Sequence, residues 1–325
     1  MLVLSAAEVV SLLDLDELVE ALQAAMIELS AGRASVPPRV AALVPEHDAM
    51  LAAMPAYLPS AGALASKLVS LFPGNREQPT HQALICCFDP HTGTPAAVMD
   101  GTYVTAARTA GGSALATRLL ARADARDVAV VGTGVQARAH GRALARLPGV
   151  QTLWIAGRDP GKARLVASEL AGDGVPARAA RSIEEAVRSA DVVCTATHAA
   201  QPVLRREWLR PGAHINSVGY NTSGDGELDT ATIQHALVVV ESRAAALAPP
   251  PAGAVELRLA IERQAIADHV VAEIGQVAAG TAPGRTDDTQ LTIYKSVGVA
   301  AQDAAVAALI LATAQRRGVG TSVSL

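Results

Sequence analysis

Two glycines and an alanine, in the order Gly132-x-Gly134-x-x-Ala137, follow the apolar run Val128–Val131. Helix-forming residues come next, over Arg138–Leu147. This order is typical of a buried strand that turns sharply into a helix, where the first glycine makes the turn and the second lets backbone approach a pyrophosphate. The N–H groups at the start of the helix would face that phosphate. The pattern predicts a dinucleotide-binding turn; the alternative is a tight turn with a purely structural role.

A second cofactor signal, Gly157-Arg158-Asp159, follows the apolar stretch Leu153–Ala156. An acidic side chain ending this strand would bond the ribose 2′-hydroxyl of NAD, whereas a glycine followed by an arginine leaves room for the 2′-phosphate of NADP and supplies a two-pronged donor. We therefore expect NADP(H) as the preferred cofactor, while Asp159 keeps NAD(H) open. The alternative for Arg158 is a solvated turn residue.

Two more predicted strands, Val192–Ala196 and His214–Val218, end in residues that could contact the same cofactor. Ligands of open α/β sheets lie outside the carboxyl ends of the strands. We expect these ends to line the nicotinamide side of the site, and two of the residues, both threonines, could equally be turn residues. The residues concerned are Thr195, Ala196, Thr197, Val218 and Gly219.

Four basic residues precede the glycine pattern and could recognise a carboxylate. Lys67 stands inside the apolar sequence A-L-A-S-K-L-V-S-L-F, where an unpaired ammonium would be unfavourable to bury. It either extends to solvent from an edge strand or faces a polar site. An arginine can bind a carboxylate through two parallel hydrogen bonds, and the candidates are Arg39, Arg76 and Arg108.

The elements that position these residues differ between two parts of the chain. The N-terminal part predicts a helix opened by Ser5 and Glu8, a second helix over Leu15–Ala31, and a mixed or antiparallel sheet. The predicted strands of that sheet are Arg39–Val44, Ala49–Met54, Gly62–Leu71 and Gln82–Asp89. From Val128 on, strands and helices alternate, which predicts a Rossmann-type, doubly wound parallel sheet.

A chain of 325 residues is longer than one hydrophobic core usually supports, so we predict two domains within the α/β class. We expect the final helix, over about Val299–Gln315, to return to the N-terminal domain. The predicted limits are residues 1–120 with 300–325 for an α+β domain and residues 121–299 for the NAD(P)-binding Rossmann domain.

The charge, cysteine content and apolar runs of the chain limit the kinds of molecule it is expected to bind and the compartment in which it is expected to work. A net charge of -4 offers no attraction to nucleic acid or to an anionic membrane, which favours a small-molecule substrate. The three cysteines, Cys86, Cys87 and Cys194, fit neither a disulfide framework nor zinc-ligand spacing, so we predict free thiols, no metal site and a cytoplasmic protein. The longest apolar run, Ala304–Ala314, is well short of the roughly 20 residues that span a bilayer.

Several motifs, spread over nearly the whole chain, together resemble the ornithine cyclodeaminase and mu-crystallin family. They are P-P-R at 37–39, M-P-A-Y at 54–57, S-K-L-V-S-L-F-P-G-N at 66–75, D-G-T-Y-V-T-A-A-R-T-A at 100–110, V-G-T-G-V-Q-A at 131–137, I-N-S-V-G at 215–219, E-L-D at 227–229, and P-G-R-T followed by Y-K-S-V-G-V-A-A-Q-D at 294–303. In combination they are far more specific than the glycine pattern alone.

The resemblance implies a homodimer that exchanges hydride between a nicotinamide and the α-carbon of an amino or imino acid. It assigns substrate binding and the dimer contact to the α+β domain of residues 1–120 with 300–325. It places the substrate at Arg39, Met54, Lys67 and Arg108, of which Lys67 and Arg108 are also catalytic positions. Together with the strand-end residues named above, the cofactor contacts that it implies complete the set Arg108, Thr109, Gly132, Thr133, Gly134, Val135, Gln136, Ala137, Gly157, Arg158, Thr195, Ala196, Thr197, Val218, Gly219, Lys295, Val297 and Gly298.

One departure from the family pattern bears on the reaction. Cyclodeaminases of this family have an aspartate after the Val-Gly pair, and Asn221 stands at that third catalytic position here. An amide neither accepts a proton at neutral pH nor supplies a negative charge for a distal ammonium. We therefore interpret the chain as an NAD(P)H-dependent imino acid (ketimine) reductase or a related amino-acid dehydrogenase. The alternatives are a cyclodeaminase of ornithine or another diamino acid, and a non-catalytic protein that binds NADPH and a ligand.

Overall fold

The computed structural model describes residues 1–220, 224–249, 252–267 and 272–324 of the chain. The chain forms two compact units, which we call unit 1 (Met1–Arg108 with Gly298–Leu325) and unit 2 (Thr109–Val297). Unit 1 combines the two ends of the chain, and unit 2 is its middle. The predicted α/β class is confirmed, with a Rossmann-type parallel sheet and a second domain.

Unit 1 is built on a seven-stranded mixed sheet in the order β15-β1-β6-β5-β4-β3-β2, in which only β1 and β6 are parallel neighbours among the described strands. Its strands are β1 (Leu2–Leu4), β2 (Val40–Val44), β3 (Ala49–Leu58), β4 (Ala63–Leu71), β5 (His81–Phe88), β6 (Pro95–Asp100) and β15 (Thr321–Ser322). Its helices are α1 (Ala6–Leu12), α2 (Leu15–Ser30), α11 (Ala300–Arg317) and the first part of α3 (Gly101–Leu120), with 3-10 turns η1 (Pro45–His47) and η2 (Pro59–Ala61).

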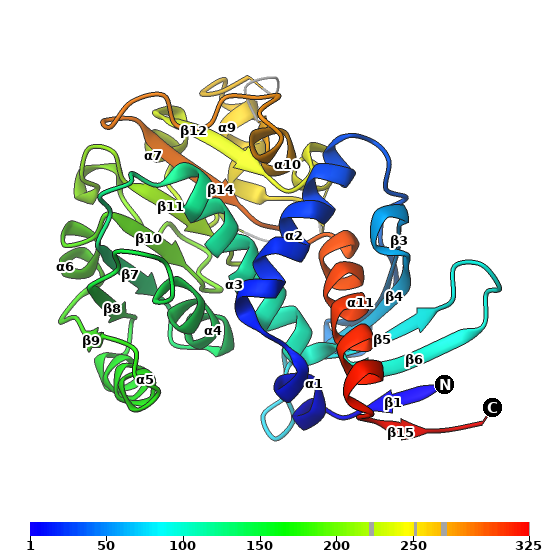
Figure 1. Ribbon diagram of the computed structural model, residues 1–325. Helices are drawn as coiled ribbons and strands as arrows, with labels where there is room; N and C mark the ends of the chain where they lie inside the picture. Colours follow the sequence, from blue (N-terminus) through cyan, green and yellow to red (C-terminus); the bar gives the residue numbers. More distant parts are fainter. Residues whose placement is uncertain (221–223, 250–251, 268–271, 325) are drawn as a thin grey trace. The chain divides into compact units, whose positions relative to one another are not determined.

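Local sequence explains how these elements begin. Ser5 and Glu8 form the predicted capping box of α1, and the Asp14 side chain accepts hydrogen bonds from the first turn of α2. Along β3, β4 and β5 buried residues alternate with more exposed ones, so one face of the sheet is covered. The apolar helix α11 covers it, in contact with β3, β4, β5 and α2 (Figure 1).

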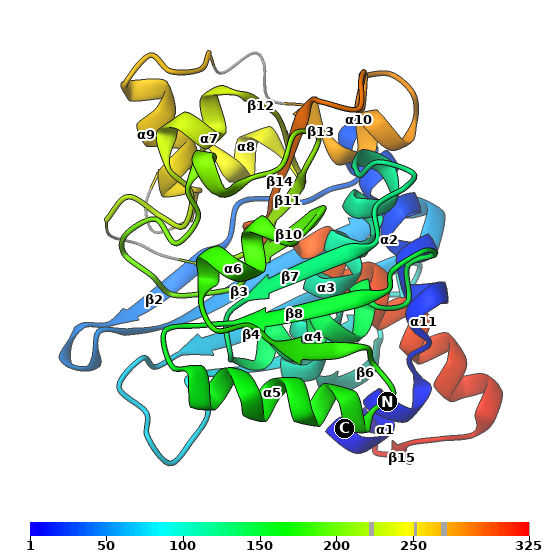
Figure 2. The ribbon, with the colours of Figure 1, turned by 90° about the vertical axis from the view of Figure 1, so that its left-hand side faces the viewer.

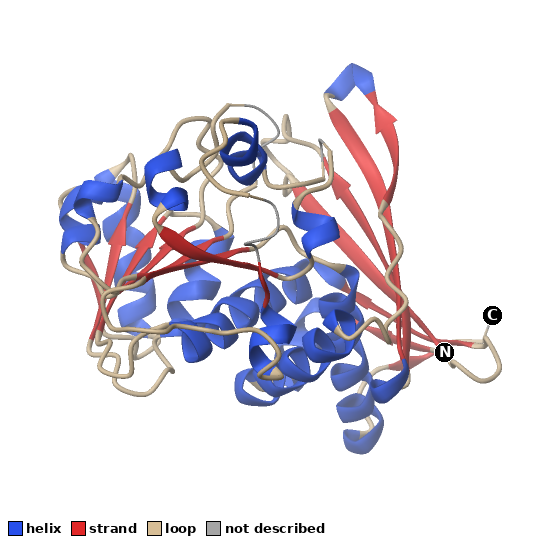
Figure 3. Ribbon diagram, turned by 90° about the horizontal axis from the view of Figure 1, so that it is seen from above, coloured by secondary structure: helices blue, strands red, loops and turns tan. Residues whose placement is uncertain are grey.

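The other face of the unit 1 sheet carries no helix in the described part of unit 1 (Figure 3). Direct cross-strand partners project to the same side of a sheet, and one such row crosses four strands. The row comprises Val40, Ala53, Leu68 and Leu84, and its three larger side chains are 72%, 38% and 51% exposed. This face of the sheet therefore carries an exposed strip of apolar side chains.

Unit 2 is built on an eight-stranded, wholly parallel sheet in the order β13-β12-β14-β11-β10-β7-β8-β9. Figure 2 shows several of its strands, among them β10, β7 and β8, side by side. Its strands are β7 (Asp127–Val131), β8 (Thr152–Ala156), β9 (Ala177–Ala179), β10 (Val192–Thr195), β11 (His214–Ser217), β12 (Ala236–Val240), β13 (Ala272–Glu273) and β14 (Leu291–Lys295). Besides the rest of α3, its helices are α4 (Val135–Leu144), α5 (Pro160–Gly172), α6 (Ile183–Arg188), η3 (Arg206–Trp208), α7 (Thr230–Gln234), α8 (Arg243–Ala246), α9 (Val255–Glu262) and α10 (Ile274–Ala278).

The central strand β7 shows why this sheet needs helices on both sides. Its successive side chains point to opposite faces, and all of Val128–Val131 is buried. Val128 and Val130 pack into an apolar cluster with residues of α4 and α5, while Ala129 and Val131 join a cluster with residues of α6, α7 and α9. The doubly wound arrangement follows from burying both faces. In the described part of the chain, helices long and apolar enough to cross a membrane are absent.

Candidate functional site

The glycine turn between β7 and α4 has the geometry of a phosphate-binding turn. Gly132 has φ +142°, and a Cβ there would lie 2.5 Å from the carbonyl oxygen of Ala196, so only glycine fits. Gly134 is the N-cap residue of α4, and a Cβ there would have nothing within 4 Å. The first turn of α4 is thus open to a ligand, and the adjacent Val135 is 68% exposed. These residues fit the pyrophosphate of a dinucleotide, with N–H groups of the helix start directed at it.

The segment that follows β8 contains Gly157, Arg158 and Asp159, and its two charged residues have different surroundings. A Cβ at Gly157 would lie 2.9 Å from Cγ2 of Thr133, so the glycine allows this segment to approach the phosphate turn. Oδ1 of Asp159 accepts hydrogen bonds from the N–H groups of Gly161 and Lys162 at 2.8 and 3.1 Å and thereby caps α5. Arg158 is exposed and has no hydrogen bond or ion pair with any described residue. The aspartate is therefore engaged with the helix, and the arginine is available to a ligand.

The carboxyl ends of β10 and β11 are tied together by a buried carboxylate, Glu227. Its oxygens accept from the Thr195 hydroxyl at 2.8 Å, from both N–H and hydroxyl of Thr197 at 2.7 Å, and from the Gly219 N–H at 2.8 Å. A Cβ at Gly219 would lie 2.2 Å from the Glu227 carboxyl carbon, which explains the glycine. The predicted cofactor residues Thr195, Thr197 and Gly219 are thus brought together by a residue that had not been assigned to the site.

The predicted cofactor residues of β14 and of the segment after it are also held by buried carboxylates. Lys295 is 2% exposed, and its Nζ lies 2.9 Å from Glu256 Oε1 and donates to the Gly219 carbonyl at 2.9 Å. The N–H of Val297 donates to Glu241 at 3.1 Å. Two further predicted residues, Thr109 and Ala137, are buried, in α3 and α4 respectively.

In unit 1, Lys67 faces a polar site. Its strand, β4, lies inside the sheet between β3 and β5, so the side chain cannot extend to solvent from an edge. Its direct cross-strand partners are Met54 and Ile85, both buried and apolar. The Lys67 Nζ lies 2.8 and 2.9 Å from the two carboxylate oxygens of Asp303 on α11. The predicted substrate residues Met54 and Lys67 are therefore neighbours, and Lys67 is paired.

Arg108, in α3, shares the same carboxylate. Its Nε donates to Asp303 Oδ1 at 3.2 Å, and its Nη1 donates to Gln302 Oε1 at 2.9 Å. The guanidinium also packs on Gly298, where φ is +74° and a Cβ would lie 2.6 Å from Nη1 and Nη2. The carbonyl of Gly298 accepts from Nη2 of Arg39 at 2.8 Å. We call Arg39, Lys67, Arg108 and Asp303 the cationic cluster.

The cationic cluster sets three positive side chains against one carboxylate. Burial lowers the pKa of Lys67 to about 8; Asp303 opposes this shift, and Arg108 and Arg39 add to it. Burial alone would raise the pKa of Asp303, but Lys67 and Arg108 hold it below its usual value. Burial, Lys67 and Arg108 together lower the pKa of His81 to about 4. The cluster therefore has an excess of positive charge and favours an anionic ligand.

Sequence reasoning named Arg39, Lys67 and Arg108, which the structure brings together, but it did not single out Asp303. The available signal was an aspartate at the start of the alanine-rich helix α11, because a buried carboxylate needs a cationic partner. Arg76, a further candidate, is exposed in the loop after β4. Asn221, the predicted third catalytic residue, lies outside the described residues.

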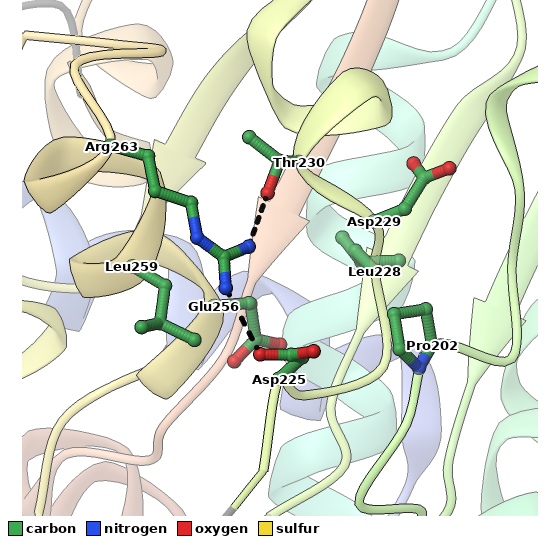
Figure 4. Close-up of a pocket in the computed structure, with 8 residues that line it drawn as sticks. All are labelled: Pro202, Asp225, Leu228, Asp229, Thr230, Glu256, Leu259 and Arg263. Atoms are coloured by element: carbon green, nitrogen blue, oxygen red, sulfur yellow. Dashed lines mark hydrogen bonds and ion pairs between the residues drawn. The ribbon is translucent and has the colours of Figure 1, made fainter.

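A separate pocket of about 240 Å³ opens in unit 2 beside α7 and α9 (Figure 4). Arg263 crosses it, donating to Thr230 at 3.0 Å and to Asp225 at 3.2 Å. None of its described lining residues is among the site residues predicted from the sequence. One lining residue, Glu256, forms an ion pair with the predicted cofactor residue Lys295. The pocket therefore lies beside the predicted cofactor residues rather than among them.

The parallel sheet and its glycine turn define an α/β protein of the dinucleotide-binding class. The chain belongs to the ornithine cyclodeaminase/mu-crystallin family, whose sequence profile matches residues 1–318. It is 37% identical over 298 residues to a ketimine reductase mu-crystallin of Mus musculus, with 90% of each chain covered.

Two solved structures are also similar. One is the Δ(1)-pyrroline-2-carboxylate reductase of Thermococcus litoralis in complex with NADH and L-proline, with TM-score 0.94, 35% identity, and 99% of this chain and 100% of that chain covered. The other is an archaeal alanine dehydrogenase dimer with bound NAD, with TM-score 0.91, 34% identity, and 100% and 99% covered. The named relatives of this chain are thus oxidoreductases, two of them reductases of imino compounds.

Proposed function

We propose that this chain is an NAD(P)H-dependent reductase that acts on the α-carbon of imino acids and, in reverse, an amino-acid dehydrogenase. The observation that carries the proposal is the cationic cluster, in which Lys67 and Arg108 share the carboxylate of Asp303 and Arg39 bonds the carbonyl of Gly298, on which Arg108 packs. An α-carboxylate would balance the excess positive charge. The pyrroline-2-carboxylate in the name of the similar Thermococcus litoralis reductase carries this group.

The two arginines of the cluster suit recognition of the carboxylate, because a guanidinium offers donors in a planar fork. Arg108 is held in place by Asp303 and Gln302, and Arg39 by the Gly298 carbonyl. Both guanidinium groups therefore meet the substrate in a fixed orientation. The apolar neighbours of Lys67, Met54 and Ile85, suit the carbon skeleton of a cyclic or branched imino acid rather than a second charged group.

Lys67 is the proposed proton donor. A lysine whose pKa lies near 8 is mostly protonated at neutral pH and still gives up its proton readily. When bound, the nicotinamide supplies the hydride. The imine carbon gains that hydride, and the imine nitrogen gains the proton that Lys67 holds at Nζ, so an amino acid is formed. Asp303 keeps the ammonium directed and charged before the transfer.

The cofactor residues proposed in unit 2 are the glycine turn, Gly157, Arg158, and the strand ends of β10, β11 and β14. The open first turn of α4 supports a bound pyrophosphate there. Arg158, which is exposed and makes no hydrogen bond or ion pair with a described residue, stands beside an Asp159 that caps α5, and it supports NADP(H) as the preferred cofactor with NAD(H) as the alternative. The two similar solved structures contain NADH and NAD, which is why NAD(H) stays as the alternative.

We assign substrate binding and dimerisation to unit 1 and cofactor binding to unit 2, near the limits expected from the sequence. The bare row of Val40, Ala53, Leu68 and Leu84 supports a homodimer contact, since such faces on soluble proteins mark interaction surfaces. All three cysteines are free, which fits the reducing environment of the cytoplasm.

The direct test mixes purified protein with NADPH or NADH and a panel of cyclic and acyclic ketimines, including pyrroline-2-carboxylate and piperideine-2-carboxylate, and follows absorbance of the reduced cofactor. We expect oxidation with at least one imine and faster turnover with NADPH. Ammonia release from ornithine with catalytic NAD, without oxidation by any imine, would instead identify a cyclodeaminase. Tight NADPH binding without turnover of either kind would identify a binding protein.

A further inference from the structure

The carboxylate of Glu227 is surrounded by hydrogen-bond donors. Besides the four donors from Thr195, Thr197 and Gly219, the Ser217 hydroxyl lies 3.3 Å from Oε2. All five can donate at once, two of them being backbone N–H groups, and an ionised carboxylate, which is an acceptor at both oxygens, satisfies them all. Glu227 is 1% exposed, and it therefore places a negative charge at the carboxyl ends of β10 and β11.

Charged side chains form hydrogen bonds with both the N–H and the carbonyl group of Gly219. Its N–H donates to Glu227, and its carbonyl accepts from Nζ of Lys295. Lys295 is itself paired with Glu256, and the Ser217 hydroxyl lies between the two carboxylates, 3.3 Å from one and 3.4 Å from the other. Glu227, Glu256 and Lys295 thus form one buried network, which we call the strand-end network.

The charges of the strand-end network do not cancel. It contains two carboxylates, and among the described residues Lys295 is the one cation within ion-pair distance of either. The excess negative charge acts on its surroundings: burial and then the charge of Glu227 raise the pKa of the Cys194 thiol on β10. A low-dielectric interior screens such a charge poorly, so its field reaches ligands at the strand ends.

We propose that the strand-end network makes the cofactor site favour the oxidised nicotinamide over the reduced one. The oxidised ring carries a positive charge and the reduced ring does not, and ligands of such sheets bind at the carboxyl ends of the strands. The buried negative charge therefore stabilises the product of hydride donation and favours hydride transfer to the imine between the bound reactants. This inference rests on the proposed function, because it requires a nicotinamide at these strand ends.

The test measures equilibrium dissociation constants for NADP+, NADPH, NAD+ and NADH by isothermal titration calorimetry on the full chain. Glu227→Gln and Glu256→Gln each remove one negative charge, and we expect the ratio of Kd for the oxidised form to Kd for the reduced form to rise on the order of tenfold. Lys295→Met removes the positive charge and should lower the ratio. Glu262→Gln, on the exposed side of α9, is the matched control with an unchanged ratio.

The ratio separates the electrostatic role from a merely structural one. A variant that only loosens the strand ends would weaken both redox forms equally, and an unchanged ratio in Glu227→Gln and Glu256→Gln would overturn the inference. If Glu227→Gln does not fold, Glu256→Gln carries the test, since the donors that Glu256 meets can also bond an amide oxygen. Failure of the wild-type protein to bind any of the four dinucleotides would instead overturn the proposed function.

Discussion

Lys67 and Asp303 are 236 residues apart in the chain, yet their side chains form an ion pair of 2.8 Å in which each is only 2% exposed. Arg108 donates to the same carboxylate. Charges this deeply buried are stable only when paired, so Asp303 controls the charge and the position of both cations. The proposed carboxylate site therefore depends on a residue of the C-terminal helix.

Replacing Asp303→Asn should impair both activity and stability. The amide has nearly the same shape but no charge, so the pKa of Lys67, which Asp303 raises, should fall below about 8. Less of the enzyme would then carry the proton at neutral pH, and kcat/KM for imine reduction should drop about a hundredfold. The loss of a buried partner should also cost about 3–5 kcal/mol in the free energy of unfolding, measured with denaturant. Wild-type kinetics in this variant would contradict the assignment.

The pH dependence of imine reduction should have an alkaline limb set by Lys67. Because its pKa is lowered to about 8 and the reaction uses the protonated form, kcat/KM should be retained below about pH 8 and decline as the pH rises through that value. Lys67→Met should abolish most activity and remove the limb from the residual rate. A profile that stays level up to pH 10 would show that the proton has another source.

Changing Arg158→Gln should alter cofactor choice without affecting the fold. In the proposed cofactor site this exposed guanidinium bonds the 2′-phosphate, so we expect KM for NADPH to rise about tenfold or more and KM for NADH to stay within about twofold. Arg178→Gln, an exposed arginine on β9, is the matched control. Equal changes in KM for NADPH and NADH would indicate that Arg158 does not distinguish the 2′-phosphate from the 2′-hydroxyl.

The two glycines of the phosphate turn should respond differently to alanine. Gly132→Ala forces a side chain into a positive-φ position 2.5 Å from the Ala196 carbonyl, so we expect a loss of about 2–3 kcal/mol in the free energy of unfolding. Gly134→Ala meets open space and should keep the melting temperature, yet its methyl group would stand where the pyrophosphate approaches and weaken dinucleotide binding. Full cofactor affinity in Gly134→Ala would argue against a phosphate there.

The bare face of the unit 1 sheet should govern oligomeric state. Leu84→Lys places a charge in the cross-strand row that links it to Leu68, which should dissociate a dimer and halve the mass found by sedimentation equilibrium. Leu165→Lys, on α5, alters a side chain that is 57% exposed, close to the 51% of Leu84, and should leave the mass unchanged. A wild-type monomer would refute the dimer proposal.

Much of the fold could be predicted because its signals are local. The Ser5–Glu8 capping box, the helix over Leu15–Ser30 and the Gly132-x-Gly134 turn each depend on residues a few positions apart. The strands that pair with β14 could not be predicted from local signals, because β14 follows β13 in the sequence but lies between β11 and β12 in the sheet. Sequence order alone does not state strand order.

The same distinction applies to the sites. The sequence by itself determined the family, the dinucleotide turn and the candidates Arg39, Lys67 and Arg108, because residue type and spacing carry that information. The tertiary structure alone decided that Lys67 is buried and paired with Asp303, and that Glu227 and Lys295 form hydrogen bonds with the backbone of Gly219. Burial and ion pairing join residues that are distant in the chain, so they arise only when the elements pack.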